Sequence, residues 1–307
     1  MHVFVTGGSG QTGPAVVAEL IAAGHTVTGL ARSDAAAARL EALGATPHRG
    51  CLDDHDSLRL GVEAEAVDGV LHLAYGGDFA DTDDMKRRDT GAIETLGRVL
   101  EGSDKPLVIT SGTLVMPPNR VSTEKDEPVA DGIASFRVAG ERACLAFADR
   151  GVRASVVRLA PTVHGPNEPA HAFIGNLVAT ARRTGKAVYV GDGTNRWPAV
   201  NRLDAAVLFR LALEKAPAGS VLHGVGETGV DFRSIAETIG RGLGVPAVSL
   251  TPDEAVAHFV NPFMATIYGF DAPASSTYTQ ELLGWSPTHW TLLEDLEHGD
   301  YLVPRAT

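Results

Sequence analysis

Cysteine, aromatic residues and long apolar runs are all scarce in this chain of 307 residues. Its two cysteines, Cys51 and Cys144, lie far apart, so no disulfide framework is indicated and a reducing cytoplasm is the natural compartment. No apolar run approaches the roughly 18 residues of a membrane span. A strand is predicted at the N-terminus, which leaves no room for a signal peptide. We therefore expect a cytoplasmic protein with no membrane partner.

Positive charge is scarce as well. The chain has 26 Lys and Arg against 38 Asp and Glu, for a net charge of −12. Without a basic run, nucleic acid is not an expected partner. The 11 histidines are scattered and neither cysteine lies in a ligand-spaced cluster, so we predict no metal site. A content of 44% hydrophobic residues still allows a sizeable core, and a small molecule is the expected partner.

What the chain does have is a glycine-rich turn at residues 6–13, between an apolar run at 3–5 and a helical stretch at 14–21. A strand, a turn and a helix N-terminus form an anion site, because unpaired N–H groups and the helix dipole point at a phosphate. Gly7 allows the tight turn, Gly10 lets the backbone approach a pyrophosphate, and Gly13 lets the helix pack against the strand. This context distinguishes the motif from a plain surface turn and predicts a dinucleotide site. The predicted cofactor contacts in the turn are Gly7, Ser9, Gly10, Gln11 and Thr12.

Strand and helix signals alternate through residues 1–165. Strands are predicted at 26–30, 46–49, 70–73, 107–109 and 155–159, and helices at 34–43, 58–64, 90–100 and 134–148. This alternation predicts an α/β, doubly wound parallel Rossmann sheet with ligands at the C-terminal strand ends. Residues 1–165 are interpreted as an NADP-binding domain, joined by returning elements around 198–224. Residues 166–307, rich in Pro and Gly, are interpreted mainly as a smaller substrate-binding lobe.

The residues at the end of the strand predicted at 26–30 indicate whether the dinucleotide is NAD or NADP. No acid stands there to hold the ribose hydroxyls of NAD; Arg32 can instead bind a 2′-phosphate in bidentate fashion and Ser33 can donate a hydrogen bond. This favours NADP(H). The alternative is that Arg32 is a solvated surface residue and Ser33 only caps the next helix. Asp53 can accept from an adenine amino group, or it can be a helix cap.

Beyond the glycine turn, further motifs resemble the short-chain dehydrogenase/reductase superfamily, on its extended-to-atypical, epimerase-like side. The residues that carry the resemblance are Thr6–Gly13, Ala31–Ser33, Asp53, His72–Ala74, Ile109–Gly112, Val157–Gly165, Asn195–Val200, Asp204–Ala206 and Leu283–Pro287. The resemblance implies further cofactor contacts by Leu73, Ala74, Tyr75, Thr110, and Pro161 to Val163. It also implies that a homodimer would form through the helices at 90–100 and 134–148.

One departure from the family concerns its catalytic pair, a tyrosine followed four residues later by a lysine. Aligned on Glu141, these positions hold Ile133 and Arg137. Isoleucine carries no proton, and Arg137 can hold ribose hydroxyls but is effectively never deprotonated. The family's serine or threonine falls among residues 111–113, so Ser111 or Thr113 remains able to polarise a carbonyl.

Other side chains could supply the chemistry in place of the lost pair. Tyr75 directly follows the fourth strand and is either catalytic or a packing aromatic beside the cofactor. His164 has acid–base chemistry near neutrality, or is a structural histidine. Arg196 and Trp197 could clamp a substrate anion and stack on a ring, or pack within the lobe. The aromatic-rich stretch at 258–270 is either a lid or the core of the lobe.

These residues together predict an NADPH-dependent reductase of a small, cyclic or aromatic carbonyl or imine, with a non-standard proton donor. Two alternatives stay open. One is a non-catalytic protein that binds NADP and senses its redox state. The other is a non-redox lyase, epimerase or cyclase that reuses the cleft.

Overall fold

The computed structural model describes residues 1–63, 66–75, 81–169, 172–259 and 262–303. Its main sheet has seven parallel strands in the order β3-β2-β1-β4-β5-β6-β10. The strands are β1 (His2–Thr6), β2 (Thr26–Ala31), β3 (Thr46–Arg49), β4 (Gly69–His72), β5 (Pro106–Gly112), β6 (Arg153–Leu159) and β10 (Ser220–Gly224). The predicted Rossmann sheet is therefore confirmed, and β10, which lies within the returning elements predicted around 198–224, joins its edge.

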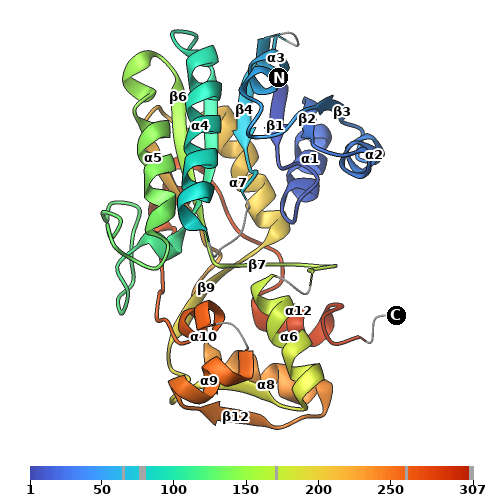
Figure 1. Cartoon of the computed structure of the whole chain (residues 1–307), viewed down its shortest axis with the longest axis vertical. Helices are drawn as coiled ribbons and strands as arrows, with labels where there is room; N and C mark the ends of the chain where they lie inside the picture. Colours follow the sequence, from blue (N-terminus) through green and yellow to red (C-terminus); the bar gives the residue numbers. More distant parts are fainter. Residues whose placement is uncertain (64–65, 76–80, 170–171, 260–261, 304–307) are drawn as a thin grey trace.

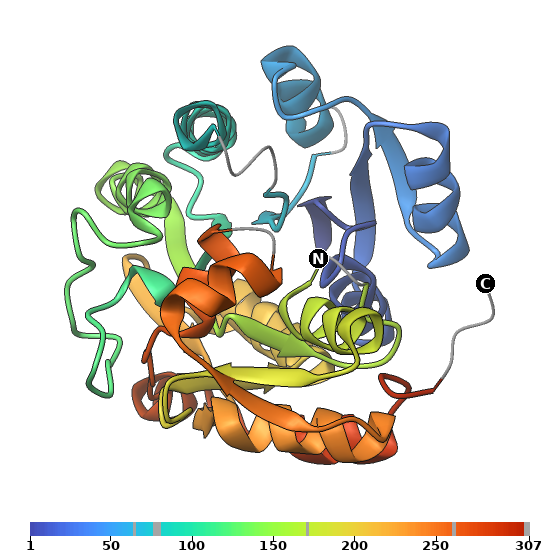
Figure 2. The same ribbon diagram turned by 60° about the horizontal axis from the view of Figure 1, so that its bottom comes forward.

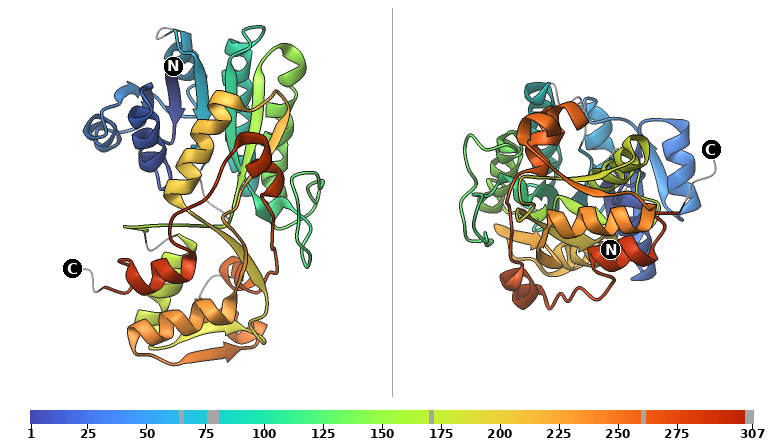
Figure 3. Two further views of the ribbon diagram at one scale, coloured as in Figure 1. Left: turned by 180° about the vertical axis from the view of Figure 1, so that it is seen from behind. Right: turned by 90° about the horizontal axis from the view of Figure 1, so that it is seen from below.

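Helices cover both faces of this sheet (Figure 1). One face packs against α1 (Gly13–Ala22), α2 (Asp34–Ala42) and α7 (Arg202–Lys215). The opposite face packs against α3 (His55–Glu63), α4 (Thr82–Leu100) and α5 (Val138–Leu145). Figure 3, seen from behind, shows α7 lying along the sheet. Because both faces are covered, the central strands carry continuous apolar runs, such as Val3–Val5 and Leu107–Ile109, instead of alternating apolar and polar residues.

The smaller lobe lies beyond the C-terminal ends of the main strands (Figures 1 and 2). A three-stranded sheet holds β11 (Glu227–Asp231), β9 (Arg196–Asn201) and β7 (Thr162–His164), and a two-stranded sheet holds β12 (Ala247–Leu250) and β8 (Ala187–Val190). The helices around them are α6 (Phe173–Thr184), α8 (Phe232–Leu243), α9 (Pro252–Phe259), α10 (Pro262–Tyr268) and α12 (Leu292–His298). The remaining helix, α11 (Thr277–Leu283), packs against β10 and α7 of the main sheet.

Several predicted boundaries need correction. The helix predicted at 90–100 begins at Thr82, because the Asp81 carboxylate accepts the N–H of Asp84 at 3.0 Å and caps it. The helix predicted at 134–148 is a short α5 flanked by 3₁₀ turns at Ser135–Arg137 and Ala148–Arg150. Strands β7, β9 and β11 were not predicted, since they are short and β9 carries a proline.

The glycine turn has the geometry that its sequence predicts. Gly7 has φ of +73° and its carbonyl accepts the N–H of Gly10 at 2.9 Å. A Cβ on Gly13 would lie 2.1 Å from the Gly7 carbonyl oxygen, so only glycine lets α1 begin this close to β1. The turn therefore brings the N-terminus of α1 to the C-terminal edge of the sheet.

Candidate functional site

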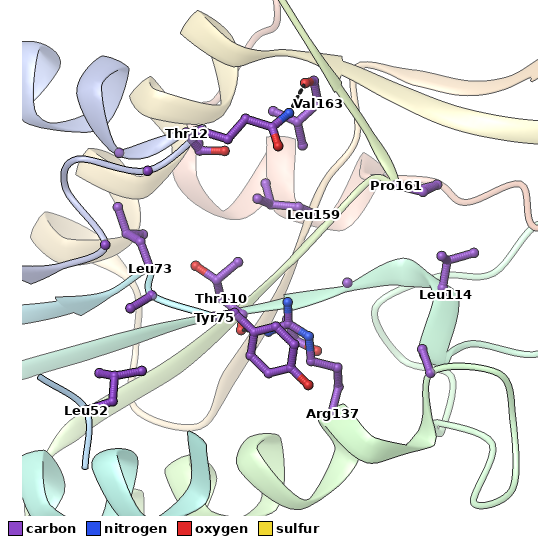
Figure 4. Close-up of a pocket in the computed structure, with 18 of the residues that line it drawn as sticks. Thr12, Leu52, Leu73, Tyr75, Thr110, Leu114, Arg137, Leu159, Pro161 and Val163 are labelled. Carbon is purple, nitrogen blue, oxygen red and sulfur yellow. Dashed lines mark hydrogen bonds between the residues drawn. The ribbon is translucent and has the colours of Figure 1, made fainter. Parts of the chain in front are cut away.

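A cavity of about 710 Å³ runs from the glycine turn, across the C-terminal ends of the central strands, to the lobe. Its volume lies in the range of small-molecule and cofactor sites. Figure 4 shows side chains from both parts of the chain around it, including Thr12 and Leu73 of the Rossmann part and Pro161 and Val163 beside the lobe. The predicted cleft between the two parts is thus present.

The nucleotide end of the cavity is lined by the glycine turn. Gly7, Ser9, Gly10, Gln11 and Thr12 all line it. No side chain caps α1 and no acid lies in its first turn, whereas Ser33 caps α2, Asn201 caps α7 and Asp231 caps α8. The first N–H groups of α1 therefore suit a phosphate from outside the chain.

Arg32 also lines the nucleotide end, at the exposed C-terminal edge of β2. Its guanidinium makes no ion pair with any residue that the structure describes. By contrast, Arg49 nearby is held by Asp34 at 2.7 Å. An exposed cation that no carboxylate neutralises is available to an anionic ligand.

Two other residues predicted to contact the cofactor at this end, Ser33 and Asp53, have partners within the chain. The Ser33 hydroxyl accepts the N–H of Ala36 at 3.2 Å and caps α2, and Ser33 does not line the cavity. The Asp53 carboxylate accepts from Nε of Arg88 at 2.8 and 3.0 Å. Arg88 and not Asp53 faces the cavity, together with Cys51 and Leu52. Asp53 therefore forms an ion pair that the sequence did not signal, because Arg88 comes from α4. The adenine contact of Asp53 stays a prediction.

The middle of the cavity contains most of the predicted residues from the central strand ends. The residues that line it here are Leu73, Ala74, Tyr75, Thr110, Ser111, Arg137, Pro161 and Val163. The Gln11 amide donates to the Val163 carbonyl at 3.5 Å and so joins the glycine turn to the start of the lobe (Figure 4).

Tyr75 and Arg137 form a close pair at this point. The Arg137 guanidinium lies 3.2 Å from the centre of the Tyr75 ring, and its Nη1 donates to the Thr110 carbonyl at 3.1 Å (Figure 4). The ring of Phe136 stacks on the Tyr75 ring, with centroids 6.1 Å apart. This cation–π contact explains how a buried arginine is accommodated beside an aromatic wall.

Burial has the largest effect on the pKa values of Tyr75 and Arg137. It raises the pKa of the Tyr75 hydroxyl above its ordinary value, and the negative charge of Asp89 adds to the rise, while the Arg137 charge opposes it. Burial lowers the pKa of Arg137, against the opposing charges of Asp89, Tyr75 and Glu141. Tyr75 is therefore neutral at physiological pH and can donate a hydrogen bond but is a weak acid.

A buried polar chain supports the segment that holds Tyr75, and sequence reasoning missed it. The His72 ring lies 2.8 Å from the Thr6 hydroxyl through Nδ1 and 3.1 Å from Asp89 through Nε2. The Thr6 hydroxyl also accepts the N–H of Ala74 at 3.2 Å. His72 was visible in the His72–Ala74 motif, but its partners lie on two other elements.

Two predicted substrate residues do not reach the cavity. Trp197 is 0% exposed in the aromatic core of the lobe, where its indole N–H donates to the Phe270 carbonyl at 3.0 Å. Arg196 is held by Asp271 through Nε and Nη2, at 3.1 and 3.0 Å. Neither can contact a ligand in the cavity as placed, so the substrate roles predicted for them are corrected to lobe packing.

His164 and Thr113 are also buried outside the cavity lining. His164 Nδ1 lies 2.8 Å from the Asp295 carboxylate of α12, which matches the structural reading of this histidine and not the catalytic one. Of the two hydroxyls predicted to polarise a carbonyl, Ser111 lines the cavity and Thr113 does not.

The lobe end of the cavity is apolar. Its lining residues are Leu114, Ile133, Ala134, Phe136, Phe173, Phe263 and Ile267. Within the aromatic-rich stretch at 258–270, Phe263 and Ile267 reach the cavity, whereas Phe259 and Tyr268 lie in the lobe core. Within α10 the helical period separates Phe263 and Ile267, which face the cavity, from Tyr268, which faces the core. The core alternative thus holds for Phe259 and Tyr268, and the lid stays a prediction.

Comparison with known proteins agrees with this geometry. Residues 3–223 match the NAD dependent epimerase/dehydratase family. The chain belongs to this family. An uncharacterised protein of Schizosaccharomyces pombe is 45% identical over 302 residues, which cover 98% of this chain and 100% of that protein.

Two further similarities are more distant. A 4-hydroxy-2-methyl-3-oxo-4-farnesyl-3,4-dihydroquinoline-1-oxide ketoreductase of Stigmatella aurantiaca is 28% identical over 271 residues, covering 84% of this chain and 79% of its own. The solved structure of MoeE5 in complex with UDP-glucose and NAD has a TM-score of 0.77 at 22% identity, covering 98% of each chain. The latter similarity shows the fold.

Two further properties concern the described ranges only. No helix there combines the length and apolarity that crossing a bilayer requires. Nor do three His, Cys, Asp or Glu side chains come together there in the manner of metal ligands.

Proposed function

We propose that this protein is an NADPH-dependent reductase of a small, cyclic or aromatic carbonyl or imine. The observation that carries the proposal is one continuous cavity with a phosphate-binding turn at one end and an apolar chamber at the other. Between them, Tyr75 and Ser111 lie at the ends of the strands where this fold binds its ligands. The quinoline ketoreductase among the relatives supports a ring ketone as the substrate type.

Arg32 supports NADP over NAD as the cofactor. It lines the cavity at the end of β2, is exposed, and is not neutralised by any described carboxylate. A guanidinium in this place suits the 2′-phosphate, which NAD lacks. Bound NADPH would supply a hydride, and Arg137, which lines the cavity beside the Thr110 carbonyl, would hold ribose hydroxyls.

The proton must come from a group other than the usual tyrosine, because Ile133 occupies that lining position. Ser111 can donate a hydrogen bond to the substrate oxygen and so polarise it. Tyr75 is the other lining hydroxyl, and the Arg137 charge beside its ring would stabilise the phenolate that remains after proton donation. The substrate carbon accepts the hydride in either case. If Ser111 only polarises the substrate, water protonates the resulting anion; if Tyr75 donates the proton, water returns a proton to its phenolate.

Turnover assays with purified protein test the proposal. We expect NADPH absorbance to fall with at least one ketone or imine in a ring-containing panel, and more slowly with NADH. The Ser111→Ala and Tyr75→Phe variants should separate the two hydroxyls by their effects on kcat. If NADPH binds and no compound in the panel is reduced, the reductase is refuted. The loss of the Tyr–Lys pair then favours the alternative of a protein that binds NADP without turnover.

Two remaining proposals concern the setting of the protein. Its two free cysteines are consistent with a reducing cytoplasm, where NADPH is available. Pairing of two copies through α4 and α5 also stays a proposal, which sedimentation at several protein concentrations would test.

A further inference from the structure

At the lobe end of the cavity, where the substrate is proposed to bind, none of the described lining residues is charged. Three cations are found among the described residues that line the cavity. Arg32 and Arg88 lie at its nucleotide end, and Arg137 lies in its middle part, against the Tyr75 ring. Around the lobe end the lining is made by aliphatic and aromatic side chains, including Ile133 and Phe173. A phosphate placed there would lose its hydration with no cation to replace it.

The arginines of the neighbouring lobe segments are turned to other partners. Arg196 is bound by both oxygens of Asp271. Arg202 donates to the carbonyl oxygens of Pro166 at 3.0 Å and Gly165 at 3.5 Å. Neither lines the cavity. No arginine in the described part of the lobe lines the cavity, so none offers a guanidinium fork to a diphosphate there.

A helix N-terminus could replace a cation, but an N–H group in the first turn of α6, at this end of the cavity, already has an internal acceptor. Helix α6 begins at Phe173, which lines the cavity. The Glu168 side chain accepts the N–H of Gly175 in the first turn at 3.1 Å. A phosphate at this terminus would compete with an internal acceptor that is itself an acid.

From these three features we propose that the lobe end binds an uncharged, apolar ring carrying the reducible carbonyl, and that it excludes nucleotide-diphosphate sugars. The inference rests on the proposed reductase function and narrows its substrate class. It separates this chain from its structural neighbour MoeE5, whose structure contains UDP-glucose. Apolar surface on the ligand is matched by Leu114, Ile133 and Ile267, and the aromatic rings of the lining can stack on a flat ring.

Equilibrium binding to the NADP⁺-saturated protein tests this without requiring turnover. Calorimetry should detect binding of α-tetralone, an uncharged bicyclic ketone, or of the smaller cyclohexanone, and no binding of UDP-glucose at the same concentrations. Ile133→Asp places a carboxylate on the apolar wall and should weaken ketone binding about tenfold or more. Ile133→Val is the matched control, because it removes only one methylene group. Since this side chain is partly exposed to solvent, we expect ketone affinity to change less than about threefold. Ile133 is only half-buried, and unchanged NADP⁺ affinity would confirm that each variant is folded.

The outcomes separate this inference from the reductase proposal. Ketone binding that depends on Ile133, without NADPH oxidation by any ring ketone or imine, refutes the reductase and keeps the apolar site. Binding of UDP-glucose, failure of both ketones to bind, or ketone affinity that Ile133→Asp leaves unchanged overturns the apolar site.

Discussion

Replacement of Arg32 by alanine should weaken NADPH binding and leave NADH binding unchanged. Arg32 is the exposed cation at the end of β2 that lines the nucleotide end of the cavity. NADPH and NADH differ only by the 2′-phosphate. A residue that contacts this group acts on one cofactor and not on the other.

The size of the effect follows from the exposure of the side chain. A hydrogen bond to a charged group contributes about 1.5–3 kcal/mol, and solvent and salt screen an exposed pair toward the lower end. A loss of about 1.4 kcal/mol is a tenfold change in the dissociation constant. We therefore expect NADPH to bind about tenfold more weakly, and the loss to shrink as salt is added.

Fluorescence titration of the reduced nucleotides measures both dissociation constants directly. Arg39→Ala is the matched control, because Arg39 is another exposed arginine of the following helix and does not line the cavity. If Arg32→Ala weakened NADH and NADPH equally, or neither, Arg32 would not bind the 2′-phosphate. The argument for NADP from this end of β2 would then be refuted.

Three further predictions concern the fold around the site. Gly13→Ala places a Cβ 2.1 Å from the Gly7 carbonyl oxygen, so we expect a lower thermal midpoint and loss of measurable NADPH binding. Glu141→Leu leaves the Arg158 cation buried without its counter-ion and should lower the free energy of unfolding in urea by about 3–5 kcal/mol. Burial raises the pKa of Glu168, so the folded state binds its proton more tightly than the unfolded chain does, and stability should fall as pH rises through and above the ordinary glutamate range. Glu168→Gln should remove that part of the fall, as measured by unfolding at a series of pH values.

Each of these has a control or a contradicting result. Gly24→Ala should cost only about 1 kcal/mol, because its φ of +85° is strained for alanine but nothing lies within 4 Å of the added Cβ. Glu101→Gln breaks an exposed pair with Arg150 and should change stability by less than about 1 kcal/mol. For Glu168, equal pH slopes in the wild type and the glutamine variant would show that its carboxyl does not set the pH dependence.

Features made by neighbouring residues were predictable from the sequence. The glycine turn, its strand and its helix are contiguous, so Gly7 and Gly13 could be assigned their roles before the fold was known. The apolar strands and the helical periods likewise predicted a parallel Rossmann sheet and its first six strands, apart from boundaries set by local caps such as Asp81. The position of Ile133 and Arg137 also followed from sequence, by alignment on Glu141.

Which polar side chains face the cavity was decided by partners that are distant in the chain. Arg196 forms an ion pair with Asp271, 75 residues away, and the His164 ring hydrogen-bonds with Asp295, 131 residues away. Asp53 is taken by Arg88, 35 residues away. A residue type indicates what chemistry a side chain can perform, but not whether that side chain is already bound by another residue of the chain.

The sequence by itself thus determined where a dinucleotide would bind and that the family's catalytic pair is absent, because both depend on residue identity within one short segment. Only the tertiary structure decided what stands around the substrate. It brought Tyr75 against Arg137, and it brought Phe173 and Ile267, from separate helices, to the same cavity as Ile133. It did so because burial of apolar surface and pairing of charges are settled between elements and not along the chain.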